Sequence, residues 1–133
     1  MPVCPPVLCP FGFTHYALTN VCFAVVTNPQ ETWDDAKLQC LLRNATLGSI
    51  HDAGEDSFLE SLIQPDHLWI GLTDLHLEGN WSWVDQTPMD YTSWKQNQPN
   101  NFGGQHCARK QDGGMWDDNF CSLTFAYMCR INL

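Results

Sequence analysis

Apolar and polar residues along the chain follow patterns that predict several strands and two helices. Residues 68–72 have the composition of a buried strand, and residues 81–84 alternate as a strand with one covered face. Further short strands are expected at residues 107–109, 115–116 and 125–129. Two helices are expected between a first strand near residues 21–26 and all of these later strands, so the pattern predicts a loop-rich α+β domain.

The two helices are marked by capping residues and by one apolar face each. Thr32 can cap the first helix, and the acids that follow lie at the positive end of its dipole. The residues expected to share one face of this helix are Trp33, Ala36, Cys40 and Leu41. Residues 52–55 have a capping-box spacing and predict the start of the second helix, which Pro65 follows. Its apolar stripe consists of Phe58, Leu59, Leu62 and Ile63.

At the start of the chain, a hairpin is expected to lead into the apolar residues 21–26. A disulfide between Cys9 and Cys22 would join its two arms. Residues 1–8 carry three prolines, which fix φ and lack the amide donor, so they are expected to form an N-terminal tail. The folded domain is then expected to cover residues 9–133.

The stretch from residue 94 to residue 118 has the composition of a functional loop. Before Cys107 it carries no apolar run at helical or strand period, but many of its side chains end in a carbonyl or carboxylate oxygen. Such long loops are usually functional or disordered. Apolar segments on both sides, and two cysteines at Cys107 and Cys121 that could clamp it, favour a functional loop.

Size and charge restrict the class of partner. The chain has 133 residues, of which 44% are hydrophobic, so one domain with one core is expected. Its formal net charge is -9, and no cluster of lysine or arginine occurs. A nucleic acid or an anionic membrane is therefore excluded as a natural partner, and cations are favoured.

Cysteine content predicts an extracellular protein. Seven cysteines fall mostly beside strand-like runs and not in the close pairs of a zinc site, which indicates a disulfide framework. No apolar run approaches the ~20 residues of a membrane span, so a secreted chain without its signal peptide is expected. Sequons at Asn44 and Asn80 fit this route, with Asn80 the poorer acceptor because its neighbouring tryptophans should enter the core.

From Cys9 to Ile131 the chain resembles the C-type lectin domain. The features that carry the resemblance occur in family order. They are Cys9-Pro10, Gly12-Phe13, Cys22-Phe23, Thr32-Trp33, Ala36, Cys40, Leu47, Ile50, Trp69-Ile70-Gly71-Leu72, Asp74, Trp81-Ser82-Trp83, Tyr91, Trp94, Gln98-Pro99-Asn100, Cys107, Trp116-Asp117-Asp118, Cys121 and Cys129.

The resemblance implies three disulfides and leaves one cysteine over. The implied pairs are Cys40 with Cys129, Cys107 with Cys121, and Cys9 with Cys22. The first two would contribute roughly 3–5 kcal/mol each by restricting the unfolded chain. Cys4 then has no partner within the chain, so an intermolecular disulfide and a covalent homodimer are expected.

The resemblance also implies a calcium ion on the long loop, to which a sugar would bind directly. The implied calcium ligands are Gln98, Asn100, Gln105, Asp117 and Asp118. Each offers an oxygen of the kind that calcium takes. Pro99 is expected to be cis, which would turn Gln98 and Asn100 toward one ion.

Departures from the family pattern predict weaker calcium binding. Amides stand at Gln98 and Gln105 where sugar-binding members usually have acids, while Asp117 replaces an asparagine. Calcium affinity follows ligand charge, so a dissociation constant of about 10⁻⁴–10⁻³ M is expected. An accessory calcium site would need Asp74, Glu78 and acids near residues 101 and 106, and only the first two are present. That site is not expected to hold calcium.

The sugar preference is expected to lean toward galactose or N-acetylgalactosamine. In the family, Glu-Pro-Asn accompanies mannose-like sugars and Gln-Pro-Asp galactose-like ones, so the motif at residues 98–100 is a hybrid. Phe102 falls where galactose binders carry an aromatic ring that stacks on the sugar. The residues expected to contact sugar are Gln98, Asn100, Phe102, Gln105 and Asp117.

Two other classes of function compete with a calcium-dependent lectin. A calcium-independent interaction module would use the same loop to meet a protein, mineral or ice surface. An enzyme is the remaining class, because His106 beside Cys107 could suggest a Cys-His nucleophile. The cysteine is better explained by a disulfide, so no enzymatic activity is expected. His15, His51, His67 and His76 are expected to be solvated, and Trp69, Trp81, Trp83 and Trp94 to belong to the core.

Overall fold

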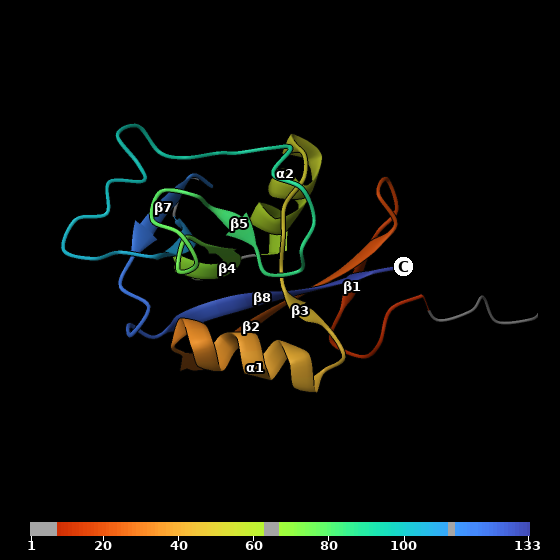
Figure 1. Cartoon of the computed structure of the whole chain (residues 1–133). Helices are drawn as coiled ribbons and strands as arrows, with labels where there is room; N and C mark the ends of the chain where they lie inside the picture. The colour runs from red at the N-terminus through yellow and green to blue at the C-terminus, as the bar shows by residue number, and fades with distance from the viewer. Residues whose placement is uncertain (1–7, 63–66, 112–113) are drawn as a thin grey trace, which may run out of the picture.

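The computed structural model describes residues 8–62, 67–111 and 114–133. Cys4 and Ile63, on which two expectations rest, lie outside these ranges. The described elements are β1 (Thr14–Tyr16), β2 (Val21–Glu31), α1 (Trp33–Leu42), β3 (Thr46–Leu47), α2 (Ala53–Leu62), β4 (His67–Thr73), β5 (Ser82–Trp83), β6 (Cys107–Gln111), β7 (Trp116–Asn119) and β8 (Phe125–Asn132) (Figure 1).

One mixed sheet connects all of these strands. Its main path runs β1-β2-β8-β4-β6-β7, while β3 pairs with β8 and β5 pairs with β4. The pair of β4 with β8 is parallel, and the other pairs are antiparallel. The last strand of the chain therefore lies between the first long strand and the strands that support the long loop.

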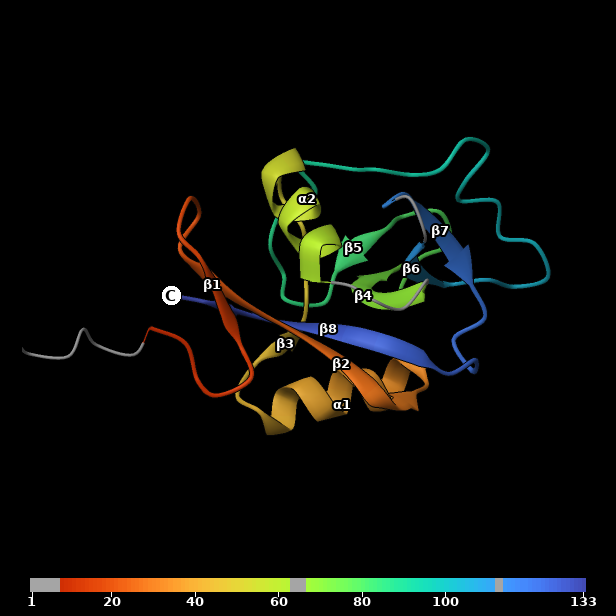
Figure 2. The same ribbon diagram turned by 180° about the vertical axis from the view of Figure 1, so that it is seen from behind.

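The two helices lie on opposite sides of the long strands β2 and β8. Figures 1 and 2 both place α1 on one side of these strands, and α2 with the long loop on the other. Two buried clusters match this division, one around Leu59 of α2 and one around Trp33 and Cys40 of α1. The loop-bearing half of the molecule thus has its own core, built on α2 and β4.

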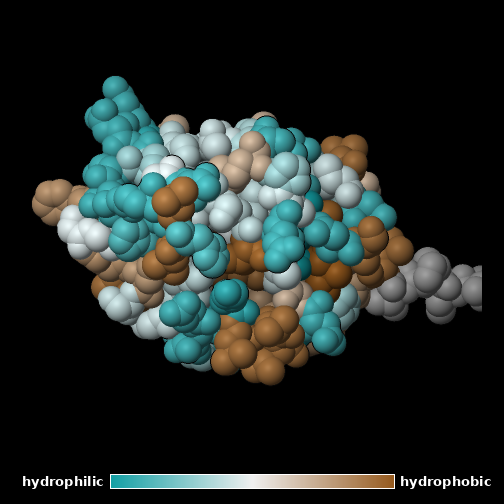
Figure 3. All heavy atoms as spheres, in the orientation of Figure 1, coloured by the Kyte–Doolittle hydropathy of each residue, from teal (hydrophilic) through white to brown (hydrophobic). Residues whose placement is uncertain are grey.

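Helix α1 begins where its cap predicts, but its buried face is narrower than expected. The Thr32 hydroxyl accepts a hydrogen bond from the Asp35 amide at 3.3 Å. Trp33, Ala36 and Cys40 are buried, whereas Leu41 is 64% exposed, so the assignment of Leu41 to the core face was wrong. Leu41 lies about 80° round the helix from Trp33, which turns it toward solvent. Figure 3 shows the resulting apolar patch over α1, formed by exposed Leu38, Leu41 and Leu42.

Helix α2 also begins at its predicted cap, with the Glu55 amide donating to Asp52 Oδ1 at 2.7 Å. The Glu55 side chain does not stay at the surface. It is 0% exposed and accepts hydrogen bonds from both terminal nitrogens of Arg130, at 2.7 and 3.1 Å. The Thr19 hydroxyl and the His51 amide donate to the same carboxylate. The start of α2 is therefore fixed to β8 by a buried ion pair.

The strands lie where the sequence pattern predicts them, but some are longer or shorter than expected. Strand β2 extends to Glu31, beyond the apolar run, while β5 keeps only Ser82 and Trp83 of the expected residues 81–84. The three implied disulfides are present: Cys9–Cys22, Cys40–Cys129 and Cys107–Cys121. Of the four tryptophans assigned to the core, Trp69 and Trp83 are buried, whereas Trp81 and Trp94 are partly buried and pack against it.

Candidate functional site

The long loop is attached at both ends to the β6–β7 hairpin. At its start, the Lys95 amide donates to the Trp116 carbonyl and the Trp116 amide donates to the Ser93 carbonyl, both at 2.8 Å. At its end, Cys107 begins β6 and is bonded to Cys121 just after β7. The loop emerges as the projection on the left of Figure 1. These attachments place residues 96–106 at one edge of the sheet.

Several residues of the loop have a left-handed backbone conformation. Asn97, Asn101, Gly103 and Gly104 all have φ between +51° and +93°, which asparagine and glycine adopt most easily. A side chain at Gly103 would also approach the Phe120 ring at 3.2 Å, so the ring would have to shift by a few tenths of an ångström. The Gln98–Pro99 peptide is cis, as the resemblance implies. Within this loop, Phe102 is 76% exposed.

Asp118 joins the hairpin to the loop. Its two carboxylate oxygens accept hydrogen bonds from the backbone amides of Asn100, at 3.2 Å, and Asn101, at 2.6 Å. The Asn100 side-chain oxygen in turn accepts from the Phe102 amide at 3.1 Å. Asp118 is buried on β7, so these bonds are shielded from competing water. The structure therefore places the Asn100 backbone amide against the Asp118 carboxylate, while the Asn100 side-chain oxygen is bonded within the loop.

Asp117 has a different partner, which the sequence analysis did not anticipate. Arg109 is its cross-strand neighbour on β6, and the guanidinium binds both carboxylate oxygens, at 2.9 and 3.2 Å. The same guanidinium lies over the Phe125 ring, 4.9 Å from its centroid. Because neighbouring residues of a strand point to opposite faces, Asp117 and Asp118 serve separate contacts. A basic residue two positions after Cys107 was the available signal, because β6 and β7 form a tight hairpin.

The two glutamines complete the set of expected calcium ligands. The side-chain oxygen of Gln98 is buried and has no hydrogen-bond donor among the described residues. A buried acceptor without a partner costs free energy unless a donor or a cation satisfies it. Gln105 is half-buried just before β6. Gln98, Asn100, Gln105 and Asp118 carry amide or carboxylate oxygens, which are the kind of ligand atom that calcium prefers. Asp117 could join them only if its carboxylate released Arg109.

A second polar cluster lies beside this loop. His106 Nδ1 is 2.9 Å from Asp74 Oδ1 and 3.2 Å from Glu78 Oε2. The pKa of the Glu78 carboxyl is raised, chiefly by its hydrogen bond with Asp74. Burial alone would raise the pKa of Asp74, but hydrogen bonds from the Gly79 amide, Glu78 and His106 lower it. The two carboxyl groups thus compete for protons in one small space.

A third polar cluster has an aspartate, a histidine and a serine bonded in the same order as in the catalytic triad of a serine hydrolase. Asp90 Oδ1 is 2.7 Å from His51 Nδ1, and His51 Nε2 is 3.0 Å from the Ser49 hydroxyl. Ser49 is 0% exposed and donates its proton to Asp85 at 2.5 Å. A nucleophile must reach its substrate and pass its proton to the histidine. The group therefore connects β3 to the loop after β5 and is not a catalytic site; it also shows that His51 is not simply solvated.

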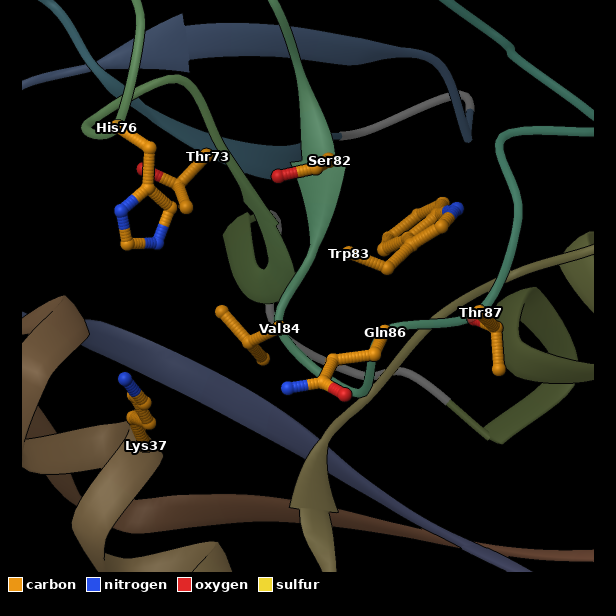
Figure 4. A pocket seen from close by; sticks show the side chains of 8 residues that line it. All are labelled: Lys37, Thr73, His76, Ser82, Trp83, Val84, Gln86 and Thr87. Atoms are coloured by element: carbon orange, nitrogen blue, oxygen red, sulfur yellow. The ribbon is translucent and has the colours of Figure 1, made fainter.

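A hollow with a volume of about 380 Å³ lies between α1 and β5, and Figure 4 shows the side chains that line it. Lys37 reaches toward it from α1, while Val84 and Gln86 line it from the segment that follows β5. None of the expected calcium or sugar ligands lines this hollow. The arrangement of oxygens described above belongs to the long loop and its hairpin, outside this hollow.

A family model of the lectin C-type domain matches residues 29–131. With its three disulfides, its mixed sheet between two helices and its long loop, the chain belongs to the C-type lectin domain family. The family and fold are those of carbohydrate-binding modules without enzymatic activity. In the described part of the chain, no helix has the length and apolar character needed to cross a membrane.

Similar proteins include lectins and antifreeze proteins. The galactose-specific lectin nattectin of Thalassophryne nattereri is 31% identical over 132 residues, which cover 94% of this chain and 81% of nattectin. The carbohydrate-recognition domain of cow CD23, solved in the presence of a GlcNAc2Man3 oligosaccharide, has a TM-score of 0.87 at 31% identity, with 94% and 96% of the two chains covered. A calcium-independent type II antifreeze protein has a TM-score of 0.86 at 30% identity, with 93% and 94% covered.

These matches confirm the α+β C-type lectin fold predicted from the sequence. The chain spans only 8% to 37% of the length of several mammalian receptors that it also matches. The activities of those whole receptors therefore do not transfer to it directly.

Proposed function

We propose that this chain is a calcium-dependent lectin that binds glycans through the long loop. Gln98, Asn100, Gln105, Asp117 and Asp118 would hold the ion. Calcium would supply the coordination positions at which two neighbouring sugar hydroxyls bind, and the amide and carboxylate groups around it would accept or donate hydrogen bonds to those hydroxyls.

One observation carries this proposal. The Gln98 side-chain oxygen is buried and has no donor within the described part of the chain, in the same loop where Asn100 is held against Asp118. A cation at this point would satisfy that oxygen and would reduce the negative charge of Asp117 and Asp118. Neighbouring domains of the same fold that are described as carbohydrate-recognition domains support the same assignment.

Galactose or N-acetylgalactosamine is the proposed sugar class. Phe102 is exposed on the long loop, and Phe120 lies next to Gly103 and is partly exposed. Aromatic faces of this kind can stack on the apolar face of a sugar. The galactose specificity in nattectin's name supports the same preference. The residues proposed to contact sugar are Gln98, Asn100, Phe102, Gln105 and Asp117.

The alternative is a calcium-independent interaction module, and Arg109 is the observation that favours it. The guanidinium already neutralises Asp117 through two hydrogen bonds, which is part of what calcium would do. An antifreeze protein described as calcium-independent also shares the fold. Arg109 therefore separates the two hypotheses.

We expect Arg109→Gln to strengthen calcium binding, because it frees both oxygens of Asp117. Lys95→Gln is the matched control: it removes the same charge from an exposed loop residue for which no bond to Asp117 is found. Calorimetry with calcium measures the affinity, and a glycan array with calcium or with chelator measures the function. Wild-type calcium affinity is expected near 10⁻⁴–10⁻³ M, and Phe102→Ala should weaken inhibition by galactose more than by mannose.

Equal calcium affinity in the two glutamine variants would exclude Asp117 as a ligand. Glycan binding that persists in chelator and is lost in Arg109→Gln would support the calcium-independent module instead.

An extracellular location and a covalent dimer accompany the proposal. Three disulfides persist best in an oxidising compartment. Cys4 lies outside the described residues, and its disulfide to a second copy would pair two weak sites and raise avidity by ~10²–10⁴ where both can engage one glycan cluster.

A further inference from the structure

The cluster of Asp74, Glu78 and His106 has the composition of a transition-metal site. One nitrogen and two carboxylate oxygens, from these three residues, lie within 4.8 Å of one another. Asp74 is buried at the end of β4, and its other oxygen accepts a hydrogen bond from the Gly79 amide at 2.9 Å. His106 is held just before the Cys107 disulfide. Two of the three donors thus come from positions that the sheet keeps in place.

Within the described ranges, no lysine or arginine forms an ion pair with this cluster. Among the ion pairs of the described residues, Arg109 binds Asp117, Lys110 binds Asp56 and Glu60, and Arg130 binds Glu55. Asp74 and Glu78 pair only with His106 in that same set. Two acids therefore share one imidazole, in a chain whose net charge is -9. A divalent cation would correct this local imbalance.

The ligand types select the kind of cation. Calcium takes six to eight oxygen ligands, and His106 places a nitrogen where an oxygen would be needed. Imidazole together with carboxylates suits zinc and similar divalent ions, which accept three protein ligands and a water. A hollow of about 260 Å³ opens onto the cluster and is also lined by His76, so a hydrated ion can reach it.

We infer that Asp74, Glu78 and His106 form a binding site for a zinc-class divalent ion, separate from the calcium ligands proposed on the long loop. The imidazole nitrogen of His106 is the donor that favours zinc over calcium at this cluster. The site does not depend on the proposed glycan function, because all three of its residues lie outside that set.

A bound ion would also stabilise the adjacent loop. The Asn101 side-chain amide donates to Glu78 Oε1, while Glu78 Oε2 faces His106. Asn101 is the residue whose backbone amide binds Asp118. An ion held by Glu78 Oε2 would therefore restrict the side chain that supports residues 100–102.

Calorimetry of the full chain tests the inference. Every sample is first treated with chelator, and every variant also carries Cys4→Ser, which removes a thiol that could bind zinc. Zinc chloride and calcium chloride are titrated separately. We expect one zinc site, whose affinity falls at least about tenfold in His106→Ala, given that even indirect partners of a metal site cost 10–100-fold. His106→Asp should weaken zinc binding to a similar extent and add a second calcium-binding event.

His15→Ala is the matched control, because His15 is a surface histidine bonded to Asn20 and far from the acids in sequence. Zinc affinity in this variant should equal that of the parent. The inference is overturned if His106→Ala binds zinc as tightly as the parent, if His15→Ala loses as much affinity, or if His106→Asp gains no calcium site. Failure of the glycan array alone would leave these results unaffected and would count only against the proposed function.

Discussion

Two clusters of charged residues in this molecule are built in opposite ways. Glu55 is fully buried and accepts four hydrogen bonds, two of them from Arg130, so its charge is neutralised within the protein. Asp74 and Glu78 lie beside the loop with one imidazole between them. The first cluster is complete without a ligand, whereas the second has more negative charge than the protein balances. The comparison indicates that cation binding is better predicted by the negative charge that the protein's own cations do not neutralise than by the number of acids in a cluster.

Arg109 and Asp117 lie between these extremes. Their ion pair is partly buried and bidentate, like that of Glu55, but it lies next to residues that are candidates for binding calcium. The protein itself thus supplies a cation at a place where an external one is expected. Substitution of Arg109 therefore distinguishes a calcium-dependent lectin from a calcium-independent module, in addition to any change in stability.

Arg130→Met should produce the largest effect on stability, because it leaves the Glu55 carboxylate buried without its main partner. Loss of one member of a buried pair costs about 3–5 kcal/mol in the free energy of unfolding. Urea denaturation measures this change. The double variant Glu55→Gln with Arg130→Met should recover part of the loss, since no buried charge remains. A single variant as stable as the wild type would show that Glu55 finds another donor.

Acid should weaken the same cluster next most strongly. Burial alone would raise the pKa of Glu55, but hydrogen bonds from Arg130, Thr19 and the His51 amide hold it below the ordinary value of 4.5. With its pKa lower in the folded state, Glu55 contributes its full stability above pH 4.5 and loses it as pH falls through the folded pKa.

Urea denaturation between pH 7 and pH 2.5 tests the acid effect. In the acid range, the wild-type free energy of unfolding should fall more steeply than that of Glu55→Gln, by up to ~1.4 kcal/mol per pH unit for one proton. Parallel curves for the two proteins would assign the acid lability to other carboxyl groups.

Glu78→Gln should produce the smallest effect, measured by the same denaturation in the presence of chelator. The Glu78 side chain is 52% exposed, and its removal relieves repulsion with Asp74. A change of less than about 0.5 kcal/mol is expected, as for other surface substitutions. Asp56→Asn is the buried counterpart, because Asp56 binds Lys110 at 2.5 Å and Tyr91 at 3.0 Å, and it should cost more. Equal losses in the two variants would contradict the distinction between the clusters.

Local features of the fold were predictable from the sequence. Thr32 and Asp52 cap the two helices as expected, because a cap depends on residues three or four positions apart. The apolar run at residues 68–72 became β4, since burial on both faces selects such a composition. The disulfide partners came from the family resemblance, because spacing alone allows many pairings.

Contacts between distant residues were not predictable in the same way. The Glu55 side chain pairs with Arg130, 75 positions away, although its spacing from Asp52 suggested only a capping role. Arg109 and Asp117 meet because β6 and β7 are in register, which the pattern of apolar residues did not fix. At the candidate site, the sequence predicted a set of oxygen-bearing side chains but not the guanidinium that binds Asp117.

The two hydrogen bonds between Trp116 and residues 93–95 have an evolutionary consequence. They hold the start of the loop independently of what the loop contains, and the Cys107–Cys121 bond does the same for its end. Because the ends stay together, lengthening the segment between them changes only a closure entropy, by ~0.6 kcal/mol for each doubling of length. Insertions near Gly103 and Gly104 should therefore be tolerated without loss of the scaffold. A chain of this kind can acquire a new ligand by exchanging a dozen residues, and the same property makes this loop a suitable place to graft a foreign peptide.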